Sequence, residues 1–300
     1  MPTMQAQFSN LLSPVLRKAF YEKEKTAESE FDKIFKIQTT ERYQEKDYDV
    51  IGLPMASVKA EGGNITYNDP LSGYLKTYTP TGYGIGFRVT WEMYNNDLYN
   101  VMKRISRSLY QSMMWKADSV AFNVFNNAFT VATGNMDSTY LCSTAHPLVP
   151  GGTASNRPTI GSDLSPTSLK AGMQHFDNLD NDYGYPVYVK PKTLLVSPSD
   201  RYTAMEILKT VDVPYSADNT INVMHNELEI KVGHWLTDTD AWFLLADKAD
   251  ECFQLNFLWR LKPTFESSDD FDSGDAKFKS FMMFDVGASG WRFIYGNPGI

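Results

Sequence analysis

The sequence predicts a mixed α+β fold, and three observations lead to that prediction. Predicted strands and helices follow one another without the regular strand–helix alternation of a parallel sheet. The segment from about 97 to 129 has the apolar spacing of a single, very long helix. Near the end of the chain, residues 278–286 alternate as a long strand does. We find no internal repeat in the sequence, so a fold built from repeated units is not predicted.

Residues 1–50 are rich in charge and predict one or two amphipathic helices at the end of an arm. Apolar residues recur at helical spacing in two groups, 11–20 and 31–35, and lysines and glutamates at 22–25 separate the groups. Two interpretations stay open. The segment is either a terminal helix docked on its own domain or an arm that packs on a neighbouring chain.

Residues 57–92 predict a protruding β element that begins with two turn signals, at 61–64 and 69–73. Residues 82–91 then alternate strictly, so one face of the strand is large and apolar while the other is nearly bare. A bare face indicates close approach of another backbone or side chain. No helix opens after the last glycine, which argues against a nucleotide loop. The large face consists of Tyr83, Ile85, Phe87, Val89 and Trp91, and the glycines opposite are Gly82, Gly84 and Gly86.

The long helix follows this strand directly. Asn95 and Asn96 can cap it, Asp97 suits its first turn, and no Pro or Gly occurs before Gly134. At 1.5 Å per residue its 32 or so residues would extend roughly 48 Å. Such a helix can act as a strut across a flat subunit, although a long core helix of an unrelated fold has the same pattern.

The second half of the chain mixes short elements. A loop rich in Gly, Ser, Thr and Pro covers 134–163, and a helix with Ser165 as cap and Pro166 at its first position follows. A strand is expected at 193–196, and Ser197–Pro198 starts another helix. Further strands are expected at 228–232, 241–245 and 252–258, followed by an acidic loop at 266–275. Aromatic residues at 291, 293 and 295 close the chain.

Composition limits the class of protein. With 300 residues, 42% of them hydrophobic, the chain can form a substantial core. Its formal charge of −8 disfavours sequence-specific binding of nucleic acid, which needs clustered Lys and Arg. Two cysteines make no disulfide framework, residues 1–10 lack a signal-peptide pattern, and no stretch approaches 18 apolar residues. We therefore expect folding in a cytoplasm, with no membrane partner.

No arrangement of residues in the sequence predicts catalysis or ligand binding. Cys142 and His146 have the spacing of a metal pair, but no second pair accompanies them, so His146 is interpreted as structural. The acidic clusters at 180–184 and 266–275 do not match a calcium loop and are interpreted as solvated. A serine-hydrolase elbow is absent, and Ser197–Asp200 has the pattern of a helix start. We predict no catalytic, cofactor-binding or metal-binding residues, and no enzyme.

Four segments together resemble the major capsid proteins of tailed bacteriophages. Residues 74–97 resemble the loop-to-spine junction of that family, and 141–148 with Ser155 and Asn156 resemble a loop of the Mu-type major head subunits. Residues 193–198 resemble the strand–helix step of the axial domain, and 271–293 resemble the closing strand. The segments occur in the family's order between residues 50 and 296.

The resemblance implies the Hong Kong 97-type phage capsid fold. Its N-terminal arm would be residues 1–50 and its extended β loop 51–92. The peripheral domain would be 93–163 with 248–290, including the spine helix at about 97–129, and the axial domain 164–247 with 291–300. The function implied is a major head protein that forms hexamers and pentamers of an icosahedral shell around double-stranded DNA.

The same resemblance implies partners and a location. Partners would be other copies of the chain, a separate scaffolding protein, a portal and a decoration protein. The location would be the virion capsid, assembled in the bacterial cytoplasm. We expect the large face of the 82–91 strand to be covered by a neighbouring subunit, because an isolated hairpin is marginally stable. An encapsulin-like compartment and a hydrolase with an unrecognised site are the alternatives. Lys59 and Lys76 lie in the loop, but no motif predicts cross-linking.

Overall fold

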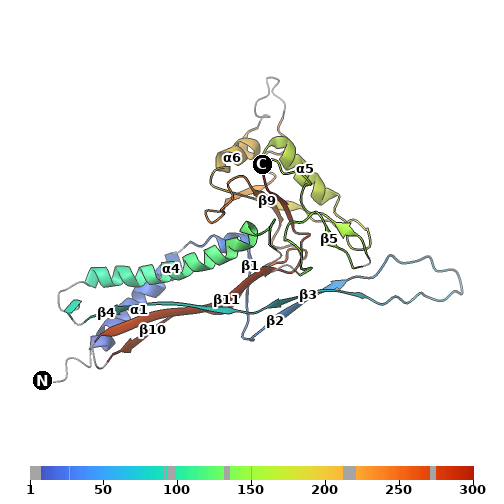
Figure 1. Ribbon diagram of the computed structural model, residues 1–300. Helices are drawn as coiled ribbons and strands as arrows, with labels where there is room; N and C mark the ends of the chain where they lie inside the picture. Colours follow the sequence, from blue (N-terminus) through green and yellow to red (C-terminus); the bar gives the residue numbers. More distant parts are fainter. Residues whose placement is uncertain are drawn as a thin grey trace.

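The computed structural model describes residues 8–26, 28–90, 92–93, 99–131, 136–149, 151–211, 221–270 and 275–300. Two four-stranded sheets, each with its own helices, and one projecting hairpin make up the molecule (Figure 1). The mixed α+β class predicted from the sequence is confirmed. One hydrophobic core runs through both sheets and their helices.

The first sheet is long and has the strand order β1-β10-β11-β4. Its centre is the antiparallel pair of β10 (Leu255–Asp269) and β11 (Ala276–Ala288). Strand β4 (Thr81–Val89) lies antiparallel to β11, and the short β1 (Lys36–Thr39) lies parallel to β10. Strand β10 runs through part of the expected acidic loop, because β11 pairs with it up to Asp269.

Two helices cover one face of this sheet. Helix α4 (Tyr99–Asn126) is the predicted spine, and its expected caps and first residues, 95–98, lie outside the described ones. Helix α1 (Phe8–Thr26) packs beside α4, with Phe20 in edge contact with Tyr110 at 5.0 Å between ring centroids. The N-terminal helix is therefore docked on its own chain. The short α2 (Phe31–Ile34) follows it.

The second sheet has the order β12-β9-β7-β8. Its strands are β7 (Pro191–Val196), β8 (Glu229–Val232), β9 (Trp242–Ala246) and β12 (Ile294–Asn297). Helices α5 (Pro166–Asp177) and α6 (Arg201–Lys209) lie beside it. Ser165 caps α5 as predicted. Helix α6 begins after Asp200, slightly later than the expected start at Ser197.

The third part is the hairpin of β2 (Glu45–Ile51) and β3 (Leu71–Tyr78), which projects from the body (Figure 1). The sequence predicted neither β1 nor β2, because residues 36–50 lie in the segment predicted as a helical arm. It also placed the 82–91 strand in the protruding element, whereas β4 belongs to the first sheet. The short strands β5 (His146–Pro147) and β6 (Thr153–Ala154) pair within the loop expected at 134–163.

Candidate assembly surface

The aromatic face of β4, which was the main predicted assembly surface, is partly covered from within the same chain. Tyr83 stacks on Phe284 with 5.0 Å between ring centroids, and Phe87 stacks on Phe278 at 5.2 Å. Val89 is completely buried. Part of the cover for these side chains comes from the chain itself, because β11 is long enough to bring its own aromatic residues to β4. That a neighbouring subunit covers the rest stays a prediction.

The glycine face of β4 is approached by β11, as the bare face predicted. A Cβ atom on Gly86 would lie 2.7 Å from the carbonyl oxygen of Phe278, closer than real Cβ contacts allow. At Gly82 it would lie 3.0 Å from the ring of Phe281, and at Gly84 an ordinary 3.4 Å from the same ring. Gly86 is therefore the position where the absence of a side chain matters most.

The remaining predicted contacts of this strand lie apart from the core. Ile85 is 47% exposed on the edge strand of the sheet, where it could meet another molecule. Trp91 lies outside the described residues. Whether any of the eight predicted residues contacts a second subunit stays a prediction.

A larger exposed surface lies at the tip of the hairpin, where the sequence reasoning named no residues. Residues 52–70 form no helix or strand, and their apolar side chains extend into solvent. Val58 is 100% exposed and Tyr67 is 91% exposed. An exposed apolar group of this size on a projecting element indicates an interaction site. The available signal was a set of scattered apolar residues on both sides of the turn motif at 61–64. Exposed large apolar residues in this tip are Leu53, Met55, Val58, Ile65 and Tyr67.

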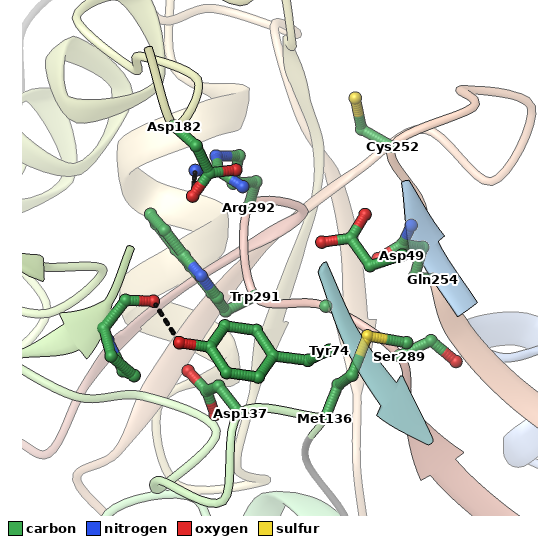
Figure 2. A pocket seen from close by; sticks show the side chains of 12 residues that line it. Asp49, Tyr74, Met136, Asp137, Asp182, Cys252, Gln254, Ser289, Trp291 and Arg292 are labelled. Carbon is green, nitrogen blue, oxygen red and sulfur yellow. Dashed lines mark hydrogen bonds and ion pairs between the residues drawn. The ribbon is translucent and has the colours of Figure 1, made fainter. Parts of the chain in front are cut away.

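The root of the hairpin is fastened to the body at a small cavity of about 140 Å³ (Figure 2). Tyr74 donates a hydrogen bond to the carbonyl oxygen of Pro147 at 3.3 Å. Asp49 shares this cavity with Asp182 and Arg292, which pair with each other at 3.3 Å. Burial raises the pKa of Asp49, the carboxylate of Asp182 raises it further, and Arg292 opposes both. Hairpin and body thus meet through polar and charged groups.

A bulge in β3 lies opposite Asp49 at this root. The register of the hairpin shifts between Tyr48 and Val50, because Gly73 and Tyr74 of β3 together oppose the single residue Asp49 of β2. A Cβ atom on Gly73, in the facing strand, would lie 2.9 Å from Oδ2 of Asp49 and 2.7 Å from its carbonyl oxygen. The glycine in the bulge therefore leaves the space that Asp49 occupies.

His146, which the sequence interpretation considered and rejected as a metal ligand, uses both ring nitrogens within the protein. Nδ1 lies 2.6 Å from Asp137 Oδ2, and Nε2 lies 3.0 Å from Asn156 Oδ1. The ring is fully buried and stacks on Trp291 at 4.6 Å between centroids. Cys142 is buried as well, and burial raises the pKa of its thiol. These contacts give His146 a structural role.

The two acidic clusters are held by protein groups where they are described. Asn181 Oδ1 accepts the backbone N–H groups of Tyr183 and Tyr185, both at 2.9 Å, and so shapes the 180–184 turn. In the second cluster Asp270 pairs with Lys277 at 2.5 Å. Within the described ranges, no group of three His, Cys, Asp or Glu side chains is placed to hold a metal ion. None of the helices described there is long and apolar enough to cross a membrane.

Comparison with solved structures shows the Hong Kong 97-type phage capsid fold. The capsid structure of cyanophage P-SCSP1u matches with a TM-score of 0.62 and 10% identity, over 91% of this chain and 88% of that one. A virus-like particle from Pyrococcus furiosus matches with a TM-score of 0.56 and 11% identity, over 95% and 98%. The capsid of bacteriophage JBD30 decorated with minor capsid protein trimers gives 0.56 and 12%, over 70% and 92%.

Sequence comparison identifies the family. A search of curated proteins finds no match to this sequence. The family model described as "Phage capsid protein", however, matches residues 74–297, which is about three quarters of the chain. The match includes β4, the spine helix α4 and both sheets apart from β1. The chain belongs to the phage capsid protein family.

Proposed function

We propose that the protein is the major capsid subunit of a tailed bacteriophage, whose copies form hexamers and pentamers of an icosahedral shell around double-stranded DNA. The observation that carries the proposal is the hairpin tip, a projecting segment whose apolar side chains have no cover in a single chain. Family membership supports the shell, and the tip supplies the surface by which one copy holds the next.

Two strands alone are marginally stable in water, and residues 52–70 add exposed apolar surface without regular structure. Burying a side chain such as that of Val58 or Tyr67 on a neighbour removes that surface from water, which favours assembly by roughly 1.5–3 kcal/mol for each large side chain. When one surface of a copy binds a different surface of the next copy, the copies form a closed ring if the rotation from each copy to the next adds up to a full turn.

The finer features of the sequence prediction are part of the same proposal. The division into arm, extended loop, peripheral domain and axial domain is proposed with the boundaries given above. A separate scaffolding protein and a portal are proposed partners, and the virion capsid, assembled in the bacterial cytoplasm, is the proposed location. The similarity to the decorated JBD30 capsid supports a decoration partner. Membership of the Mu-type head subunits and the absence of enzymatic activity are proposed as well.

An encapsulin-like compartment is the second candidate, favoured by the similarity to a Pyrococcus furiosus virus-like particle. The content of purified shells separates the two functions. Shells isolated from infected cells should contain duplex DNA in the first case and a protein cargo in the second.

Electron microscopy of the purified protein tests the proposal, with shells or six-fold and five-fold rings as the expected result. Val58→Asp should abolish them without changing the melting temperature of the unassembled subunit, because the side chain is fully exposed. Ile160→Asp, a matched change at a residue 80% exposed outside the hairpin, serves as control. Normal shells from Val58→Asp would remove the tip from the mechanism, and no shells from the unchanged protein would refute the function.

A further inference from the structure

The helical layer of the first sheet has a charge opposite to that of the whole chain. Helices α1 and α4 together contain eight basic residues and three acidic ones, a formal charge of +5, whereas the chain has −8. One of the three acidic residues, Asp118, is buried and accepts backbone N–H groups, so it adds little to the exposed face. The basic groups are therefore concentrated on one side of an acidic molecule.

The packing of the two helices places these groups in one surface. The helices run in the same direction, since Ser106 of α4 donates to the carbonyl oxygen of Leu16 and Phe20 contacts Tyr110. Both lie on the same face of the sheet (Figure 1). At 100° per residue, the three basic side chains in the first half of α4 fall within about a third of the helix circumference. They are Lys103, Arg104 and Arg107.

Most of these cations have no acidic partner among the described residues. Glu22 is shared by Lys18 at 4.0 Å and Arg107 at 3.4 Å. No ion pair with a described side chain is found for Lys25, Lys103 or Arg104. The opposite face of the sheet differs, because Lys279 pairs there with Glu266 at 2.9 Å, and Lys277 and Arg88 also have acidic partners. Lys25, Lys103 and Arg104 therefore give the helical face positive charge that no described carboxylate pairs with.

We infer that the layer of α1 and α4 lines the inside of the shell and binds the phosphates of the packaged duplex without sequence specificity. The inference rests on the proposed capsid function. A wall around a polyanion has lowest energy with its basic face inward and its acidic surface outward. Scattered Lys and Arg side chains bind duplex DNA weakly, through phosphate contacts whose strength falls as salt rises. That is suitable for a wall that must later release the DNA.

Fluorescence anisotropy tests the inference. A labelled duplex of about 30 base pairs is titrated with unassembled subunits at increasing NaCl concentrations. For each phosphate contact, the logarithm of the affinity falls by about 0.9 per unit increase in the logarithm of the salt concentration. The test variant combines Lys25→Gln, Lys103→Gln and Arg104→Gln. We expect at least a tenfold loss of affinity at low salt. The slope should become shallower by up to about 2.7, the value for three lost contacts.

The control variant removes the same three charges from the opposite face, as Arg88→Gln, Lys277→Gln and Lys279→Gln. Its affinity should change less than twofold. Equal losses in both variants, or no duplex binding by the unchanged subunit, would overturn the inference. Binding of poly-glutamate but not of duplex at the same salt would also overturn it and assign the face to an acidic protein. Shells seen by microscopy without duplex binding leave the capsid function standing, whereas no shells would refute both.

Discussion

The buried pair of His146 and Asp137 gives the sharpest prediction, because the molecule contains an exposed counterpart. In the buried pair the two side chains are 0% and 3% exposed and 2.6 Å apart. His234 and Glu30 form a pair at 2.5 Å, but His234 is 67% exposed. Geometry and chemistry are nearly the same, so a comparison of His146→Ala with His234→Ala isolates the effect of burial.

The magnitude follows from what each change leaves behind. His146→Ala leaves the carboxylate of Asp137 buried and without its imidazole partner, while the hydroxyl of Thr139 still donates to it at 2.8 Å. It also takes from Asn156 a hydrogen bond and from Trp291 a stacked ring. Removing one partner of a buried pair costs about 3–5 kcal/mol. An exposed pair contributes about 0–1 kcal/mol, so His234→Ala should have almost no effect.

Thermal unfolding of the unassembled subunits at one scan rate measures the difference. For chains of this order of size, about 1 kcal/mol corresponds to roughly 2–4 °C, so His146→Ala should lower the melting temperature by roughly 10 °C. The His146→Ala, Asp137→Ala double variant should be less destabilised than the sum of the single variants, by about 2 kcal/mol. Additive effects, or a loss below about 1 kcal/mol in His146→Ala, would refute the argument.

The pH dependence of this pair has a defined sign. Burial alone would raise the pKa of Asp137, but the hydrogen bond and charge of His146 and the donors of Thr139 outweigh it and hold the pKa below 3.8. A carboxyl group whose pKa is lowered by folding stabilises the fold above its unfolded pKa and loses that effect as pH falls through the folded value. The difference between the unchanged protein and Asp137→Asn should therefore shrink as the pH falls below about 4.

Two further substitutions test the fold around the spine. Burial raises the pKa of Asp118 to about 6, although the backbone N–H groups of Phe31 and Glu30 lower it. Because the pKa of this carboxyl group is higher in the folded than in the unfolded protein, the folded state loses stability as the pH rises from about 3.8 through about 6. Asp118→Asn should then gain up to about 3 kcal/mol relative to the unchanged protein between pH 4 and pH 8 in denaturant titrations; a difference independent of pH would contradict this. Gly86→Ala should lower the melting temperature by an amount equivalent to about 1–3 kcal/mol, because the new Cβ meets a carbonyl of β11, whereas Gly84→Ala should not. Equal melting temperatures of Gly86→Ala and Gly84→Ala would show that β4 can move away from β11 at little cost.

The elements that sequence reasoning predicted well are those specified by residues close together in the chain. Helix α5 begins where Ser165 and Pro166 predict, because a capping box needs only four consecutive residues. The spine helix α4 was equally clear from apolar spacing and from the absence of Pro and Gly. Its existence was predictable because its signal is local and long.

The elements that were missed depend on distant partners. Residues 36–39 form a strand only because β10 offers them a parallel edge more than 200 positions later. Residues 45–51 carry alternating charges rather than a strong apolar pattern, and they pair with β3 across the exposed tip. The length of β10 was underestimated for the same reason, since its polar second half is kept extended by β11. Strand pairing over such separations leaves little trace in local composition.

The candidate assembly site was only partly predictable, for a related physical reason. Alternation in residues 82–91 correctly indicated a strand with a large face and a bare face, but it could not indicate which surface covers either one. The cover comes from β11, roughly 190 residues further along. Net charge has the same limitation. The total of −8 disfavoured sequence-specific binding of nucleic acid, but it did not indicate that the packed helices α1 and α4 carry a formal charge of +5. A sum over the sequence loses the direction of charge, and direction decides which side of a shell meets its contents.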